Sequence, residues 1–188
     1  AYVQECPSTA VFNYLFTEKV YKCIFDIASI GVDHISIDLD GGSEQLEIIR
    51  TSVKIISILL EFQETYVEEF VSIVLKHRKS NFFMPKDFGL HGLRSFYDAI
   101  FFNLPVIAHL GLYVGLNDDT LASSSLKILK KLSSRYSNDH SQFNAKNKLL
   151  TILDSVDESA SIKDAFISQV ERPIDCTEAL NLKLQLLE

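Results

Sequence analysis

The amino-acid sequence predicts an all-α protein, and three observations lead to that prediction. Four prolines and seven glycines are spread over 188 residues, and they divide the chain into segments of helical length. Within these segments apolar residues recur at spacings of three and four, which is the period of an amphipathic helix. No stretch combines sustained strict alternation with flanking hairpin turns. The nearest case, Ile35–Leu39, has no obvious strand to pair with.

The clearest predicted helix covers Ser43–Phe62. Ser43 is a favoured N-cap residue, and Glu44 and Glu47 stand in the first turn, where carboxylates stabilise the helix dipole. Two apolar stripes run along it, the first comprising Leu46, Ile49, Val53, Ile56 and Leu60 and the second Ile48, Ile55, Leu59 and Phe62. So wide an apolar surface predicts burial against more than one neighbouring helix.

Helix-breaking and capping residues delimit the other helices. Pro105 suits the first turn of a short helix that Gly115 closes, and Asn117 or Asp118 suits the N-cap of the next one. Further helices are expected at Thr9–Ile30 with a break near Thr17, Thr65–Lys79, Leu90–Leu104, Ser141–Ser155, Ser161–Arg172 and Thr177–Leu187.

Apolar spacing also predicts the core, which should include the segment Phe96–Val114. The residues expected to face inward are Ile100, Phe101, Leu104, Val106, Ile107, Leu110 and Val114, followed by Leu121, Ser125, Ile128, Leu129 and Leu132 of the helix capped by Asn117 or Asp118. About eight helices joined by short turns predict an irregular HEAT- or armadillo-like α-solenoid of stacked antiparallel helix pairs, because no repeat of fixed period is present.

Residues 1–188 are expected to form a single α-solenoid fragment of a longer protein. The last predicted helix carries Leu180, Leu184 and Leu187 on one stripe and Leu182 and Leu186 near another. A terminal helix with one neighbour covers only one of these stripes, and natural solenoids finish in polar caps. The fragment should therefore self-associate through its ends.

Composition restricts the classes of function. The formal net charge is −7, whereas a protein that binds duplex nucleic acid usually presents a basic face. Cys6, Cys23 and Cys176 are far apart and include no CxxC pair, so neither a zinc ribbon nor a disulfide framework is expected. No apolar run reaches the roughly 20 residues of a membrane span, so we expect no direct membrane insertion.

Motifs that would indicate catalysis or a metal are missing from the sequence. The acidic run Asp38–Glu44 departs from a calcium loop, with Gly42 at the fifth position and Ile49 at the twelfth. Gly89–Gly92 lacks the spacing of a nucleotide-binding loop. The histidines, His34, His77, His91, His109 and His140, show no metal-ligand spacing. His109 lies in an apolar helical segment, so we expect a hydrogen-bonded histidine in the core. Without a GxSxG elbow either, we predict no enzyme, no catalytic, cofactor-binding or metal residues, no cofactor and no small-molecule substrate.

Two segments have both a structural and a functional interpretation. The cations of Lys76–Lys79 either stabilise a helix C-terminus or form a nuclear localisation or nucleic-acid patch, and the first interpretation is favoured. Phe82–Pro85 either packs against a neighbouring helix pair or lines a groove for a partner peptide.

The stretch FGLHGLRSFYDAIFFNLPVIAHLGLYVG at Phe88–Gly115 resembles the very large α-solenoid nucleoporins of the inner ring of the nuclear pore complex. The upstream Leu59–Tyr66 and the downstream Leu121–Leu132 are similar to the same family, so the resemblance covers about Glu44 to Leu132. It implies a question-mark-shaped solenoid that scaffolds the pore in the nuclear envelope, supports protein and mRNA transport and binds short segments of linker nucleoporins. It supplies no catalytic residues and names no partner-binding residue here. The alternative is an importin-like transport receptor or another helical adaptor.

Overall fold

The computed structural model describes residues 20–30, 42–77, 96–97, 99–137 and 148–187, and every regular element in these ranges is a helix. The elements are α2 (Val20–Ala28), α3 (Gly42–His77), a short helical stretch at 96–97 and 99–101, α5 (Leu104–Tyr113), α6 (Asp119–Ser137), α7 (Lys148–Ser155), α8 (Ser159–Glu171) and α9 (Thr177–Leu187). The predicted all-α, solenoid-like fold is confirmed.

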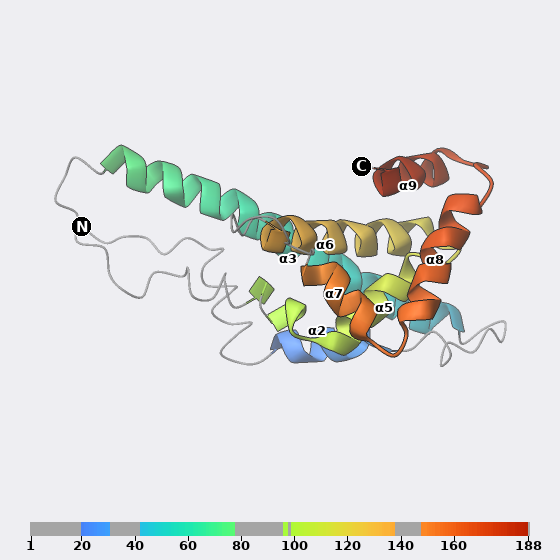
Figure 1. Ribbon diagram of the computed structural model, residues 1–188. Coiled ribbons are helices and arrows are strands. Elements are labelled where there is room, and N and C mark those ends of the chain that lie inside the picture. The colour runs from blue at the N-terminus through green and yellow to red at the C-terminus, as the bar shows by residue number, and fades with distance from the viewer. Residues whose placement is uncertain (1–19, 31–41, 78–95, 98, 138–147, 188) are drawn as a thin grey trace.

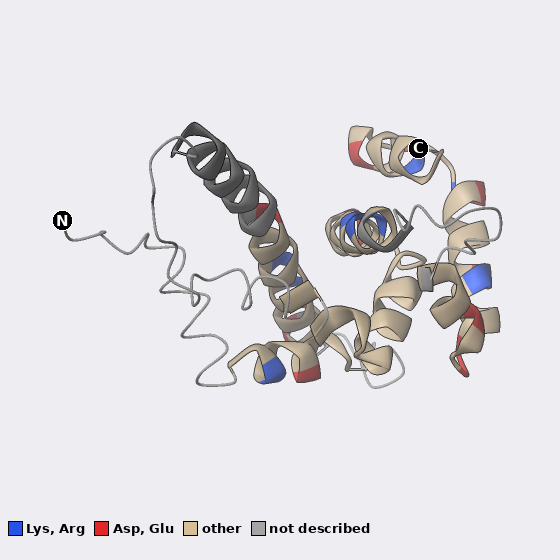
Figure 2. Cartoon of the chain, turned by 60° about the vertical axis from the view of Figure 1, so that its left-hand side comes forward, with Lys and Arg blue, Asp and Glu red and all other residues tan. Residues whose placement is uncertain are grey.

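Helix α6 is the centre of the arrangement, since it contacts α3, α5, α7 and α9 (Figure 1). A second view places α3 and α9 on opposite sides of α6 (Figure 2). The side chains that the sequence predicted to face inward from α6 are all buried: Leu121, Ser125, Ile128, Leu129 and Leu132. On the α9 side, Leu182 is buried and the Ser123 hydroxyl donates to Gln185 Oε1 at 3.1 Å.

Helix α3 replaces two predicted helices with one. The sequence suggested separate helices at Ser43–Phe62 and Thr65–Lys79, whereas α3 runs without interruption from Gly42 to His77. Residues 63–64 are Gln and Glu, both good helix formers, so nothing in the chain ends the helix there.

The two apolar stripes of α3 have different surroundings. Ile49, Val53, Ile56 and Leu60 are fully buried against the rest of the core, as predicted. Ile48 and Ile55 of the second stripe are exposed, so their predicted burial is wrong for the described part of the chain. Leu59 is partly buried against the core.

Helix α5 begins as its proline predicts and is deeply buried. Asn103 is its N-cap, and its Oδ1 accepts the N–H of Val106 at 3.2 Å. The predicted inward residues Val106, Ile107, Leu110 and Val114 are fully buried, but Leu104 is exposed because it stands at the first position, where the chain turns out of the preceding helical stretch.

Tyr113 joins α5 to the end of α2. Its hydroxyl donates to the Ile30 carbonyl oxygen at 2.6 Å, and burial raises the pKa of the phenol above its ordinary range. Phe25 of α2 lies beside Phe96, and their ring centroids are 5.9 Å apart. These contacts hold α2 against the same core that α3 and α5 share.

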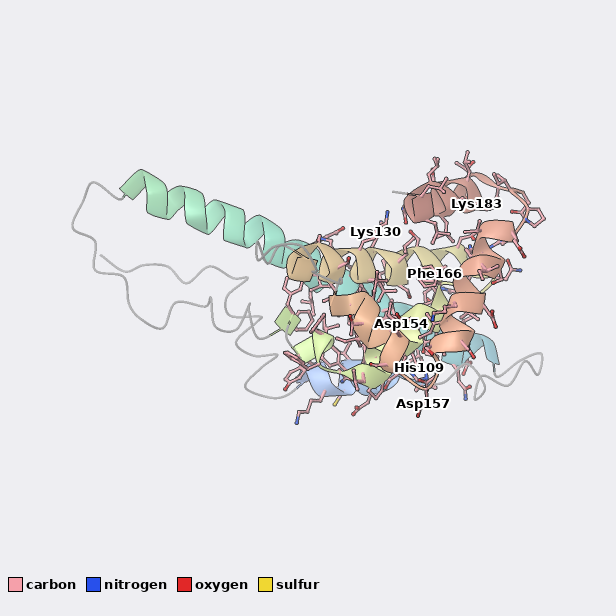
Figure 3. The ribbon with its side chains drawn as sticks, viewed as in Figure 1. His109, Lys130, Asp154, Asp157, Phe166 and Lys183 are labelled. Atoms are coloured by element: carbon pink, nitrogen blue, oxygen red, sulfur yellow. The ribbon has the colours of Figure 1, made fainter. Side chains whose placement is uncertain are left out.

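Two glycines set the close packing of α5 on α8. A Cβ built on Gly111 would lie 2.9 Å from Ile162 Cγ2, and one built on Gly115 would lie 2.6 Å from Ala165 Cβ and 2.7 Å from Ala165 Cα. Phe166 of α8 also packs against the core (Figure 3). The α8 backbone therefore approaches the end of α5 more closely than any side chain would permit.

Replacing Phe101 with Ala should lower the free energy of unfolding by about 3–5 kcal/mol, the usual range for a buried aromatic. Phe101 is 4% exposed, whereas its neighbour Phe102 is 73% exposed and provides the matched control. Urea denaturation followed by circular dichroism measures both variants. A Phe101→Ala protein as stable as the Phe102→Ala protein would contradict the core assignment.

Gly115→Ala should lower the free energy of unfolding by about 1–3 kcal/mol, the range for overpacking a tight contact. The new methyl group would meet the Ala165 backbone, which cannot move aside without shifting α8. Gly111→Ala should cost less, because it meets only side-chain atoms of Ile162 and gains helix propensity. Thermal melts of the two variants side by side test this order, and equal melting temperatures would refute it.

Candidate functional site at the start of α6

Two consecutive aspartates at the start of α6 hold helices on either side of it. Asp118 is the N-cap and Asp119 is the first helical residue. A carboxylate is favoured at this end of a helix because free N–H groups and the positive end of the dipole lie there. Each aspartate also pairs with an arginine from a distant part of the chain, so the helix start is a junction of three helices.

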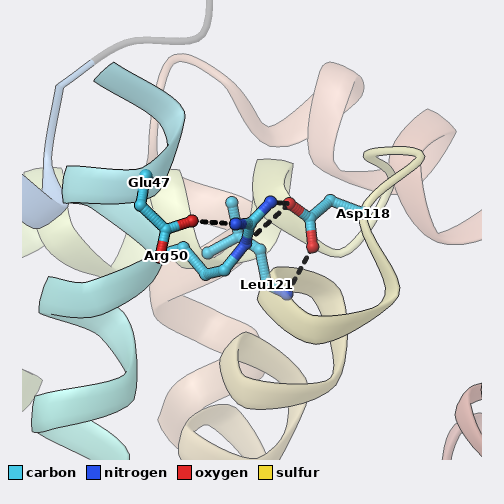
Figure 4. Close-up of polar contacts among 4 residues, drawn as sticks. All are labelled: Glu47, Arg50, Asp118 and Leu121. Carbon is cyan, nitrogen blue, oxygen red and sulfur yellow. Dashed lines mark hydrogen bonds and ion pairs between the residues drawn. The ribbon is translucent and has the colours of Figure 1, made fainter. Parts of the chain in front are cut away.

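Asp118 uses its two oxygens for two tasks (Figure 4). Oδ1 accepts the N–H of Leu121 at 3.0 Å, which completes the predicted N-cap. Oδ2 accepts from Arg50 of α3, with Nη2 at 2.6 Å and Nε at 3.0 Å. Glu47, one turn before Arg50, also pairs with the guanidinium. The hydrogen bond to Asp118 is the main cause of the raised pKa of Arg50.

Asp119 faces the opposite side and pairs with Arg172, which follows the last residue of α8. Arg172 Nη1 lies 2.7 Å from Asp119 Oδ1, and both side chains are about four-fifths buried, at 19% and 20% exposure. Pro173 explains the geometry, since a residue before proline is driven out of the α region. Arg172 accordingly has ψ 136°, and α8 ends at Glu171.

Cys176 is joined to the same junction. Its Sγ accepts the N–H of Ala179 at 3.4 Å at the start of α9 and lies 3.6 Å from Asp119 Oδ2. The Ala179 N–H lowers the pKa of the thiol, but desolvation and the neighbouring carboxylates of Asp175 and Asp119 outweigh it, so the net pKa is raised. A reactive cysteine needs the opposite shift, because the thiolate is the nucleophile.

A pocket of about 320 Å³ opens beside this junction, between the α5–α6 turn and the end of α8. Its lining consists of Gly115, Asn117, Ser168, Gln169, Arg172, Pro173 and Asp175. Gln169 is 2% exposed, and its side-chain amide has no hydrogen-bond partner among the described residues. A second depression, of about 560 Å³, lies between α2 and the start of α5, with Phe25, Phe102 and Pro105 in its lining.

Comparison with known proteins identifies the family. Residues 1–188 match the family described as nuclear pore complex scaffold, nucleoporins 186/192/205. The chain belongs to this nucleoporin family. A relative within it, nucleoporin NUP192 of Chaetomium thermophilum, is 26% identical over 181 residues, a match that covers 93% of this chain and 10% of the relative. The chain thus spans about a tenth of the length of that nucleoporin.

Membership confirms the resemblance predicted from Phe88–Gly115 and its neighbours. The nuclear pore complex is the location of this nucleoporin chain, and structural scaffolding is its family's role. The importin-like alternative gains no support from these matches. No helix in the described part of the chain is long and apolar enough to cross a membrane.

Most segments singled out in the sequence lie outside the described residues. These are 31–41, with most of the acidic run, Gly89–Gly92, Phe82–Pro85, His34, His91 and His140, while Lys76 and His77 are described as helical backbone only. Glu44 lies exposed in the first turn of α3. The described residues contain no group of three His, Cys, Asp or Glu side chains arranged for a metal.

His109 is hydrogen-bonded, as expected, but only half-buried. Its Nδ1 lies 2.7 Å from the Pro105 carbonyl oxygen within α5 (Figure 3). The expected placement in the core is therefore wrong, because the turn that His109 shares with exposed Pro105 faces outward. The junction residues Arg50, Asp119 and Arg172 were missed, since their partners are 53 and 68 positions away along the chain.

Asp118→Ala should destabilise the nucleoporin chain by about 1–3 kcal/mol, because it removes an N-cap worth about 0.5–2 kcal/mol together with an ion pair. Asp118→Asn keeps the capping oxygen and should cost less than about 1 kcal/mol. Urea denaturation at low and high salt measures both, with exposed Asp157→Asn as the control. The junction is unimportant for stability if Asp118→Ala unfolds at the same urea concentration as the parent.

Proposed function

We propose that this chain is one stretch of a longer α-solenoid, and that it serves the nuclear pore scaffold by presenting helical surfaces to neighbouring helices and to other nucleoporins. The observation that carries the proposal is the family match over residues 1–188, together with a relative about ten times as long. The central placement of α6, with helices on both of its sides, supports a layered array.

The outer face of α9 supports continuation of the array. Leu180, Leu184 and Leu187, the α9 leucine stripe, follow the i, i+4, i+7 spacing of one helix face and are all exposed, while Leu182 packs on α6. Ile167, Val170 and Ile174 of α8 and its C-terminal turn are exposed as well. A solenoid repeat buries such a face against its neighbour, so the proposed occupant is the next helix of the longer protein.

The proposed role is binding, without catalysis. The one cysteine joined to the α6 junction, Cys176, has a raised pKa and an acidic neighbour in Asp119, the reverse of an activated thiolate. The carboxylates of Asp118 and Asp119 are both engaged in ion pairs with arginines, so neither is available as a general base without breaking a structural contact.

The α9 leucine stripe should cause concentration-dependent self-association of the isolated chain. Leu184→Glu places a charge in the stripe and should shift the sedimentation profile toward monomer. Asn181→Glu, an exposed change on the same helix outside the stripe, should leave the profile of the parent unchanged. A chain that sediments as a monomer at high concentration, with or without Leu184→Glu, would contradict the proposed stacking face.

The proposed partners are short linear segments of linker nucleoporins. Fluorescence anisotropy with peptides that tile the disordered regions of other nucleoporins should detect saturable binding to the chain. A Ran-type GTPase and an import cargo peptide serve as the comparison. Binding of these two, with no binding of linker peptides, would favour a transport receptor and refute the scaffold proposal.

A further inference from the structure

We propose that the pocket beside the α6 junction binds the main chain of an extended basic peptide. The inference deepens the proposed function and rests on it, since it gives the partner segment a place on this chain. The pocket is lined by the α5–α6 turn at Gly115 and Asn117, by the end of α8, and by Pro173 and Asp175 in the α8–α9 turn.

The side-chain amide of Gln169, which lines the pocket without a hydrogen-bond partner in the described part of the chain, indicates a ligand. The side chain is 2% exposed and lines the pocket, and none of the described residues hydrogen-bonds to its amide. The amide is not sealed in the core, because the only fully enclosed side-chain atom without a partner in the described part is the Ser125 hydroxyl. A ligand that reaches the amide through the pocket can supply the hydrogen bonds that the protein does not.

The chemistry of the lining selects a peptide group. A glutamine side chain offers one acceptor oxygen and two donor hydrogens in a plane, which complements a peptide bond of an extended chain. Asn117, which also lines the pocket, provides the same pair of functions. A volume of about 320 Å³ is at the small end of ligand pockets, so it accommodates a short stretch of chain and excludes a folded domain.

The charges around the pocket select a basic residue beside that peptide group. Arg172 is neutralised by Asp119 at 2.7 Å, while Asp175, 3.9 Å from Arg172 Nη2, keeps a side chain that is 67% exposed. Arg172, Asp119 and Asp175 together carry one net negative charge, which favours a lysine or arginine of the ligand at the rim. The chain as a whole carries a formal charge of −7, which favours the approach of a basic segment.

The probe is the capped tripeptide acetyl-Gly-Lys-Gly-amide, titrated into the isotopically labelled chain while the side-chain NH₂ signal of Gln169 is followed by NMR. We expect a saturable shift, weaker for acetyl-Gly-Glu-Gly-amide. Gln169→Leu should lower the affinity about tenfold through the lost hydrogen bonds, and Asp175→Asn should reduce the preference for lysine over glutamate about threefold. Gln45→Leu and Asp157→Asn, which change exposed residues, are the controls. They should change neither the affinity for the tripeptide nor the preference for lysine over glutamate.

The assignment is overturned if the Gln169 signal does not move up to the solubility of the tripeptide, or if Gln45→Leu weakens binding as much as Gln169→Leu. Asp175→Asn changes an exposed residue, so it tests the charge preference even if Gln169→Leu alters the fold. If linker peptides bind the parent and Gln169→Leu equally, the proposed function is supported, but the pocket is not where they bind. If the tripeptide binds and no linker peptide does, the pocket is a peptide site, but the proposal that linker nucleoporins are the partners is wrong.

Discussion

The start of α6 imposes the constraint on which the rest of the arrangement depends. The first N–H groups of any helix lack partners within the helix, and Asp118 satisfies one of them through Oδ1. The same carboxylate also holds Arg50 through Oδ2, so capping α6 fixes α3 beside it. Asp119 does the same toward α8 through Arg172. One position in space thus decides how the helices on both sides of α6 are placed.

Packing between α5 and α8 acts together with this polar junction. Gly115 lets the α8 backbone come close to the end of α5, and Pro173 then releases Arg172 from the helix toward Asp119. The pocket with Gln169 is left between these fixed elements, because the α5–α6 turn and the end of α8 cannot close further. A close glycine contact and an ion pair therefore shape a pocket that neither would make alone.

Local signals predicted the helices and most of the core. The stripe containing Ile49 and Ile56, the proline that starts α5 and the cap at Asp118 all depend on neighbours within one turn or two, so the sequence was sufficient. Exposure of Ile48 and Leu104 was not predictable, because periodicity shows that a face is apolar without showing what covers it.

The candidate site was less accessible to sequence reasoning than the fold. Arg50 lies three residues after Glu47 in α3, and nothing near it in the chain indicates Asp118 as its partner. Gln169 lies in α8 with no motif around it, and its lack of a partner becomes evident only when α5 and α8 are packed together. Sites built from segments far apart in the chain follow from tertiary packing, which residue spacing does not encode.

The length of α3 has a mechanical consequence. A helix of 36 residues is about 54 Å long, and the fully buried side chains described on it lie between Ile49 and Leu60. Its C-terminal half extends beyond the other labelled helices (Figure 1). The helix therefore acts as a lever that the core holds up to Leu60, and Leu60 is its fulcrum. A tilt of about 10° at that fulcrum would move the far end, about 26 Å beyond Leu60, by roughly 4–5 Å. A small change of angle between two layers of a pore scaffold would in this way become a displacement as large as the spacing between neighbouring residues.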